Sequence, residues 1–241
     1  FIENATNIGL SKNQKDLFTI LDNLIEEVKN AYPQALCKDK CSSCCETFGL
    51  PRTTAIEWQL VHKYMVNEMS EEQRQLIIER TIELFSSQIS QLLEEQERIQ
   101  VSHTKADQDR PGKPDFKCLQ CPFLIKGSCS IYPARPGICR SYGYFSVRVT
   151  GNTTVFACQM AADHIVNTLK ENNVEHWALP VWDKFSDKLY KLNGNHPIST
   201  LPIWLLIHLD ENNKLKTTLE KNPDFYSLLK KYHSDTFAEN V

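Results

Sequence analysis

The sequence predicts a mainly α-helical fold: a single helical domain with a cysteine-rich metal site and a small β-hairpin. Long segments with apolar residues at helical spacing predict the helices. The nine cysteines, all between residues 37 and 158 of the 241-residue chain, predict the metal site. A chain of this length can bury one substantial core, so we expect one domain over 1–241. The chain has a formal net charge of −3, whereas dedicated nucleic-acid-binding proteins are basic, so we expect no nucleic-acid partner.

Within this domain we expect a metal-binding core over 37–158, preceded by an N-terminal helix over 12–32. Apolar side chains recur there at spacings of three and four residues and form one stripe: Leu17, Leu21, Leu24, Val28 and Ala31. Pro33 then ends the helix, because proline cannot continue the backbone hydrogen bonding. A second helix is expected to begin near Thr53, directly after the first cysteine cluster.

A long third helix is expected over 70–102. Ser70 and Gln73 match a capping box, the reciprocal pairing of side chains and backbone that starts many helices. Its inward side chains are expected to be Ile78, Ile82, Phe85, Ile89, Leu92 and Ile99. An exposed apolar stripe on this helix would support a partner-binding adaptor, whereas complete burial of the stripe would contradict that hypothesis.

The remaining elements follow the second cysteine cluster. Val147 and Val149 before a Gly151-Asn152 turn, and Val155 after it, predict the β-hairpin. A helix is expected over 159–171, and a helical C-terminal extension over 172–241 ends in the helix "NPDFYSLLKKYH". The longest apolar run, "LPIWLLIHL", is too short to span a membrane.

The cysteine spacing indicates thiolate ligands for a metal. The Cys41/Cys44 and Cys118/Cys121 pairs have the Cys-x-x-Cys spacing that lets two sulfurs reach one ion. Adjacent side chains diverge, so we expect Cys44 and Cys45 to serve two ions, or one of them to pack. The thiols that remain are enough for a second site: Cys37, Cys45, Cys129, Cys139 and Cys158. Two zinc sites and an iron–sulfur cluster, with or without a second metal, are weighted almost evenly.

Two other interpretations of the cysteines are weaker. A secreted disulfide scaffold is usually much shorter and has an even number of cysteines, so we expect reduced thiols and a cytoplasmic protein. The segment "CKDKCSSC" has the spacing found in radical S-adenosylmethionine enzymes, but helices rather than barrel strands are expected on both sides of it. The chain begins at Phe1 rather than methionine, so a removed leader is compatible with it.

The segments "CKDKCSSCC" and "CPFLIKGSCSIYPARPGICRSYGY" resemble the YkgJ-type cysteine-cluster family of zinc- or iron-chelating proteins, over 37–158. The resemblance implies eight metal ligands: Cys37, Cys41, Cys44, Cys45, Cys121, Cys129, Cys139 and Cys158. Two features depart from the family's C-x-x-C-x-x-C-C pattern. The first gap has three residues instead of two, and Cys118 is an extra candidate ligand.

The resemblance implies a metal site without specifying a reaction. The cysteine pattern is also similar to that of flagellin lysine-N-methylases, so the alternative is a metal-cluster-dependent enzyme, either redox or S-adenosylmethionine-dependent, with a protein substrate or partner. Its candidate catalytic residues are Arg135, Arg140 and Tyr132. A guanidinium beside Cys139 would stabilise a thiolate or receive an anionic substrate. The simpler role for both arginines is to donate hydrogen bonds to carbonyls of the ligand loop.

Overall fold

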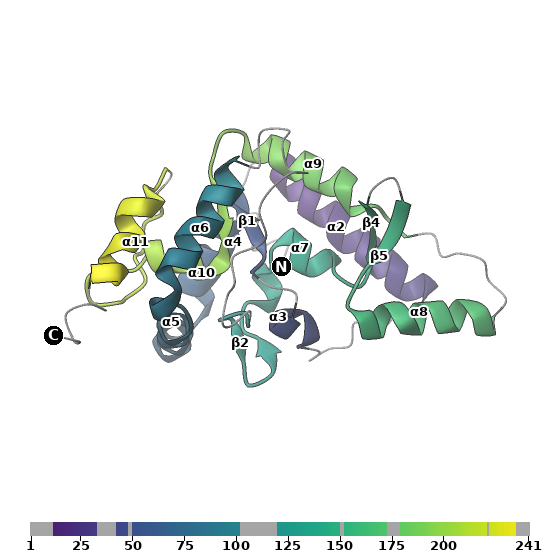
Figure 1. The fold of residues 1–241 in the computed structure, drawn as a ribbon. Coiled ribbons are helices and arrows are strands. Elements are labelled where there is room, and N and C mark those ends of the chain that lie inside the picture. Colours follow the sequence, from purple (N-terminus) through teal and green to yellow (C-terminus); the bar gives the residue numbers. More distant parts are fainter. Residues whose placement is uncertain are drawn as a thin grey trace.

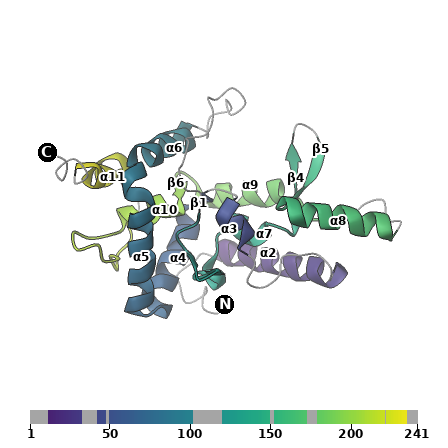
Figure 2. The ribbon, with the colours of Figure 1, turned by 60° about the horizontal axis from the view of Figure 1, so that its bottom comes forward.

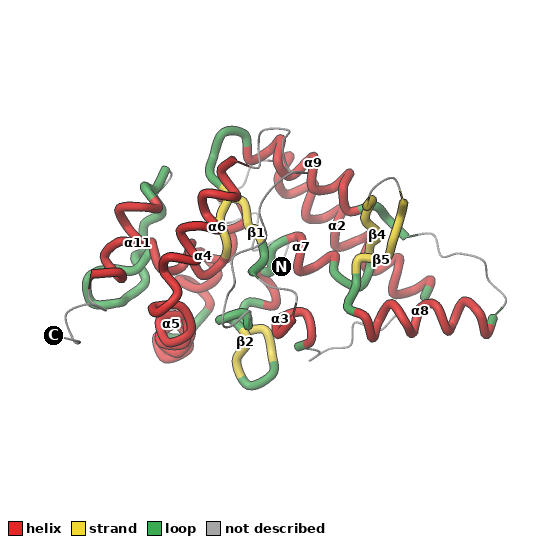
Figure 3. Tube along the Cα trace, in the orientation of Figure 1, coloured by secondary structure: helices red, strands yellow, loops and turns green. Residues whose placement is uncertain are grey.

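Helices dominate the computed structural model, which describes residues 12–32, 42–47, 50–101, 120–149, 152–172, 179–220 and 222–234. The strands are short and form only two-stranded antiparallel pairs within these ranges (Figure 3). The predicted fold class, mainly α with a small hairpin, is confirmed. Two groups of helices flank a central region in which the cysteine-bearing elements lie (Figure 1).

The first group is built on α2 (Lys12–Ala31) and α9 (Trp182–Asn193), which pack against each other. The predicted apolar stripe of α2 is buried at Leu17, Leu21 and Val28, whereas Leu24 is partly buried and Ala31 is exposed. From α9, Phe185 and Leu189 join the same core cluster. The predicted N-terminal helix is therefore confirmed, and part of the C-terminal extension covers it.

The second group contains α4 (Ala55–Glu68), α5 (Glu71–Phe85), α6 (Ile89–Val101), α10 (Leu201–Ile207) and α11 (Phe225–Ser234). All residues of α10 are buried, because the run "LPIWLLIHL" is apolar on every side and forms the centre of this core. Trp204 of α10 stacks on Trp58 of α4 with ring centroids 6.1 Å apart. Helix α4 contributes to both cores through different faces, so it joins the two groups.

The prediction of one helix over 70–102 is wrong. A 3₁₀ turn, η1 (Ser86–Gln88), separates α5 from α6, and Figure 2 shows the change of direction between them. The break lets α5 pack on α10 while α6 packs on α11. The start of α5 was predicted correctly, because the Ser70 hydroxyl accepts a hydrogen bond from Gln73 N and Ser70 N donates one to the Gln73 side chain.

The apolar stripe of α5 and α6 lies in the core. Ile78, Phe85, Ile89, Leu92 and Ile99 are buried, and Ile82 is partly buried. The stripe therefore does not offer the exposed apolar surface that the adaptor hypothesis requires.

Three short strand pairs position the ends of the helices. Strand β1 (Arg52–Thr54) pairs with β6 (Ile198–Thr200), although these strands are far apart in the sequence. Strand β2 (Leu124–Ile125) pairs with β3 (Ser128–Cys129). The predicted hairpin is formed by β4 (Phe145–Val149) and β5 (Asn152–Phe156), and α8 (Gln159–Glu171) follows as predicted. Asn152 belongs to β5 and pairs with Val149, so its assignment to the turn was wrong; Gly151 lies outside the described residues.

Candidate metal site

Three segments bring five cysteines into the region between the two helix groups. The short helix α3 (Ser43–Thr47) carries Cys44 and Cys45. The segment that contains β2 and β3 carries Cys121 and Cys129, and α7 (Gly137–Ser141) carries Cys139. The backbone N–H of Cys121 donates to the Cys45 carbonyl at 2.7 Å, which ties the first segment to the second. Cys121 is buried and Cys45 and Cys129 pack partly buried against the second helix group.

The adjacent thiols of Cys44 and Cys45 lie close together. Their sulfur atoms are 4.0 Å apart. Two thiolates on one tetrahedral zinc ion are separated by about 3.8 Å, given a zinc–sulfur distance of about 2.3 Å. Contrary to the expectation, the two side chains do not diverge here. The expectation that they serve two ions, or that one of them packs, stays a prediction.

The thiols influence one another electrostatically. Burial raises the pKa of Cys139 well above its ordinary value, and the thiols of Cys129, Cys45 and Cys44 raise it further, while Arg135 opposes this. Burial also raises the pKa of Cys129, against hydrogen bonding from the Ile131 backbone and the charge of Arg135. Thiolates that would repel one another in this way lie close together, and a bound cation would neutralise their charge.

The two thiols on α3 show the same effect through direct contacts. A hydrogen bond with the Cys121 side chain is the largest cause that raises the pKa of Cys45 to about 12. The hydrogen bond with Cys45 is in turn the largest cause that raises the pKa of Cys44. Because a bound metal requires thiolates, metal binding at this cluster must displace protons.

The described thiols do not complete a coordination shell. Within the ranges given above, no group of three or more His, Cys, Asp or Glu side chains is arranged to hold a metal ion. Cys37, Cys41 and Cys118 lie outside the described residues. Cys158 is half-buried at the N-cap of α8, and the sulfur interactions described above do not include it. The structure thus brings five of the predicted ligands together and places Cys158 at the start of α8.

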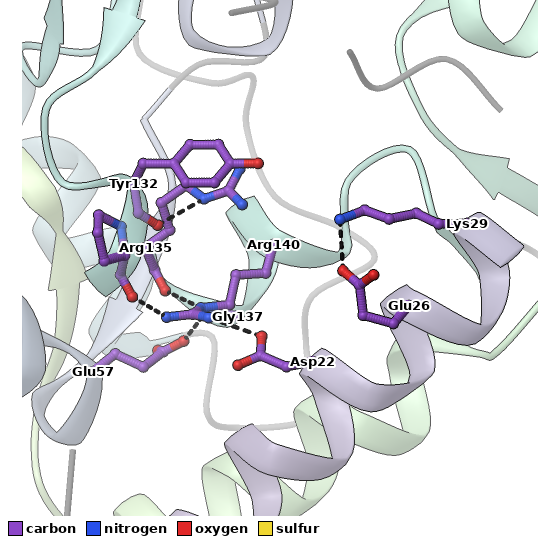
Figure 4. A network of polar contacts seen from close by, with 9 residues as sticks. Asp22, Glu26, Lys29, Glu57, Tyr132, Arg135, Gly137 and Arg140 are labelled. Atoms are coloured by element: carbon purple, nitrogen blue, oxygen red, sulfur yellow. Dashed lines mark hydrogen bonds and ion pairs between the residues drawn. The ribbon is translucent and has the colours of Figure 1, made fainter. Parts of the chain in front are cut away.

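Arg140 organises the ligand loop between Cys129 and Cys139 (Figure 4). Its guanidinium donates to the carbonyl oxygens of Pro133 at 2.6 Å and Arg135 at 2.8 Å, and it forms an ion pair with Asp22 at 2.8 Å. These contacts close the loop that runs from the 3₁₀ turn η2 (Tyr132–Ala134) into α7. The simpler predicted role of Arg140, hydrogen bonding to loop carbonyls, is therefore present.

The other two candidate catalytic residues face the outside of the site. Tyr132 is 44% exposed, and the Arg135 guanidinium lies over its ring, 3.5 Å from the centroid. Arg135 Nε also donates to the Tyr132 carbonyl at 3.2 Å. Because Arg135 opposes the raised pKa values of Cys129 and Cys139, its charge acts on the thiols from this partly exposed position.

A buried carboxylate holds the other end of α7. Glu57 Oε1 accepts from the backbone N–H of Gly137 at 2.7 Å, while Oε2 accepts from the backbone and hydroxyl of Thr54. Burial raises the pKa of Glu57, and the donors at Thr54 and Gly137 oppose that shift. A Cβ atom at Gly137 would lie 3.0 Å from Trp182 Cη2 and 3.3 Å from Glu57 Oε1, so a glycine suits this close approach.

Comparison with known proteins supports the metal interpretation. Residues 36–159, which include all nine cysteines and η2 through α7, match the family model "CxxCxxCC: Putative zinc- or iron-chelating domain". The chain belongs to the CxxCxxCC family. No curated protein and no solved structure matches the chain.

Two residues that support the CxxCxxCC site were missed by the sequence analysis. Asp22 lies on α2, before the residues that the family model matches, and Glu57 lies within them, between the first and second cysteine clusters. For Glu57 a usable signal was present, because Thr54 and Glu57 have capping-box spacing and both halves of that box are formed. For Asp22 we find no sequence signal, since its partner Arg140 is 118 residues away.

Proposed function

We propose that this protein binds zinc or an iron–sulfur cluster through its cysteine cluster. The observation that carries the proposal is the convergence of Cys44, Cys45, Cys121, Cys129 and Cys139 from three separate segments. Burial raises the pKa of Cys129 and Cys139, and neighbouring thiols add to the raised pKa of Cys139, so thiolates are unfavourable in this region unless a cation neutralises them. The family match supports the same conclusion.

The donor set fits both candidate groups chemically. Sulfur ligands are soft and anionic, which suits zinc and iron–sulfur clusters and disfavours magnesium or calcium. The proposed ligands are these five cysteines together with Cys37, Cys41 and Cys158, and Cys118 is the extra cysteine. When bound, zinc would supply structural cross-links or a Lewis acid, whereas a cluster would supply electron transfer.

The test is elemental analysis of protein purified without oxygen, with zinc, iron and acid-labile sulfide counted per chain. We expect either one to two zinc ions without sulfide, or iron with sulfide. Cys139→Ser should lower the metal content, because it removes a buried sulfur that neighbours Cys129, Cys44 and Cys45. Cys118→Ser is the matched control, and the proposed ligand set predicts that it keeps its metal. Absence of metal from wild-type protein, even after reconstitution with zinc or with iron and sulfide, would contradict the proposal.

A metal-dependent enzyme is the second candidate. It is favoured by the exposed Tyr132–Arg135 pair beside the thiols, because a guanidinium stacked on a tyrosine is held ready to bind an anionic group. Since the guanidinium of Arg140 is turned inward to Asp22 and the loop carbonyls, this candidate assigns the substrate-facing role to Arg135 and Tyr132. Arg135→Ala would then abolish activity on an anionic or protein substrate while the metal content stays unchanged.

The proposal also bears on where the protein works. Thiols that bind metal must stay reduced, which favours the cytoplasm over an oxidising compartment. The six cysteines whose state the structure describes are free thiols. Among the helices in the described ranges, none is both long enough and apolar enough to cross a membrane.

A further inference from the structure

The geometry points to Asp22 of α2 as a positioning residue of the metal site: its carboxylate holds Arg140, and Arg140 fixes the loop between the ligands Cys129 and Cys139. This inference rests on the proposed metal-binding function and extends it to a helix outside the residues that the family model matches. It predicts that metal affinity depends on a side chain that touches no metal ligand.

The contacts of Arg140 form a continuous link from α2 to the loop. Asp22 Oδ1 accepts from Arg140 Nη1 at 2.8 Å. The remaining two donor nitrogens of the guanidinium, Nη2 and Nε, reach the carbonyls of Pro133 and Arg135. The guanidinium thus bridges one carboxylate on α2 and two carbonyls in the loop (Figure 4). Helices α2 and α7 also pack against each other along this link.

Burial distinguishes this ion pair from an ordinary surface pair. The side chain of Arg140 is 7% exposed and that of Asp22 is 28% exposed. One turn further along α2, the Lys29–Glu26 pair is 42% and 64% exposed, and such pairs contribute little. A buried guanidinium stays charged, so without Asp22 it loses the ion pair that compensates for its burial. Arg140 would then turn toward water and release Pro133 and Arg135.

Release of these carbonyls would act directly on two ligands. Cys129 lies just before the loop, in β3, and Cys139 lies just after it, in α7. The loop therefore sets the separation of two sulfurs, and that separation must match the metal before binding if affinity is to be high. Groups that orient metal ligands without touching the metal typically change affinity by about 10- to 100-fold when they are removed.

The experiment titrates metal-free protein with Co²⁺, whose thiolate charge-transfer absorption reports how many sulfurs bind. Wild type is compared with Asp22→Asn, with the charge-conserving Asp22→Glu, and with Glu26→Gln. The last variant is a matched control, because it makes the same change of charge on the same helix at an exposed pair. We expect Asp22→Asn to bind Co²⁺ about tenfold more weakly with an altered absorption spectrum. Asp22→Glu should recover most of the affinity, and Glu26→Gln should equal wild type.

The outcomes separate this inference from the proposed function. A wild type that takes up neither Co²⁺ nor iron with sulfide contradicts the proposed function. A wild type that binds Co²⁺, together with an Asp22→Asn variant of unchanged affinity and spectrum, overturns the role of Asp22 alone. Chemical denaturation of the metal-free variants identifies a purely structural role, in which stability falls but the Co²⁺ spectrum stays the same; that result also overturns the inference. If Asp22→Asn does not fold, Arg140→Lys keeps the charge pair but loses the carbonyl bonds, and it should show the same weaker binding.

Discussion

The carboxylate of Glu57 and the backbone N–H of Gly137 are joined by a 2.7 Å hydrogen bond across 80 residues of sequence. The same carboxylate caps the first turn of α4 through Thr54. One buried side chain therefore fixes both the start of a core helix and the start of the short helix that carries Cys139.

Replacing Glu57 with glutamine should destabilise the metal-free protein by about 1–2 kcal/mol. Glutamine can still accept from Thr54, but its amide NH₂ would face the Gly137 N–H, so one buried donor loses its acceptor. Relief of the buried charge offsets part of this loss, because burial raises the pKa of Glu57. Urea unfolding followed by circular dichroism measures the free energy.

The matched control for this variant is Glu68→Gln, which makes the same change of charge at the exposed end of the same helix. It should change the free energy of unfolding by less than about 0.5 kcal/mol. Equal effects of the two substitutions would mean that the contact with Gly137 contributes nothing specific.

Replacing Arg135 with glutamine should slow the alkylation of the metal-free thiols at pH 8. Arg135 opposes the raised pKa values of Cys44, Cys129 and Cys139, so its loss leaves fewer thiolates at a given pH. Since Arg135 is partly exposed, we expect a modest effect, about two- to tenfold in rate. Mass spectrometry of peptides after timed reaction with iodoacetamide gives the rate for each cysteine.

Lys126→Gln serves as the control for Arg135→Gln. Lys126 is an exposed cation in the turn between β2 and β3, whereas the cation that lowers the pKa of Cys129 and Cys139 is Arg135. Its substitution should leave every alkylation rate unchanged. An unchanged rate in Arg135→Gln as well would show that the guanidinium does not act on the thiols.

Acid should destabilise the protein through a buried histidine. His208 Nδ1 donates to the Trp204 carbonyl, and His208 Nε2 accepts from Glu220 N, so the ring is neutral. Burial lowers the pKa of His208 to about 4, whereas an unfolded histidine has a pKa of about 6.5. Between pH 6.5 and 4 the histidine is protonated in the unfolded chain but stays neutral in the folded protein. The contribution of the neutral His208 to the free energy of unfolding is therefore fully present above pH 6.5. It falls by about 3 kcal/mol as the pH decreases to 4.

Urea unfolding of the metal-free protein at several pH values tests this prediction. His208→Gln should remove a large part of the stability loss between pH 6.5 and 4, whereas His196→Gln, at an exposed histidine, should not. A slope that is the same in wild type and His208→Gln would assign the acid sensitivity to other groups, among them His62, whose pKa is also lowered by burial.

Replacing Gln96 with alanine should weaken the attachment of the C-terminal part of the chain to α6. Gln96 is fully buried, donates to the Ile198 carbonyl at 3.0 Å and accepts from the Ser199 hydroxyl. Its loss removes two buried hydrogen bonds, at a cost of about 2–4 kcal/mol. Gln100→Ala, at an exposed position one turn later in α6, should cost less than about 0.5 kcal/mol. Thermal unfolding of both variants gives the comparison, and equal melting temperatures would contradict it.

Much of the fold could be predicted because it depends on short-range patterns. The stripe of α2, the capping box at Ser70 and the hairpin of β4 and β5 arise from residues a few positions apart. The cysteine spacing likewise indicated a metal site, because the reach of a Cys-x-x-Cys turn is local. Where prediction failed, as at the break between α5 and α6, the helical pattern continues through the break and only the packing partners differ.

The sequence by itself thus determined most helix boundaries, the hairpin and the presence of sulfur ligands. Only the tertiary structure decided which thiols become neighbours and what holds them. Asp22 with Arg140 and Glu57 with Gly137 are far apart in the chain, and nothing in their local surroundings indicates their partners. The physical reason is that a hydrogen bond or ion pair forms wherever packing brings complementary groups together. Packing depends on the whole apolar pattern, whereas a helix or a ligand turn depends only on its own few residues.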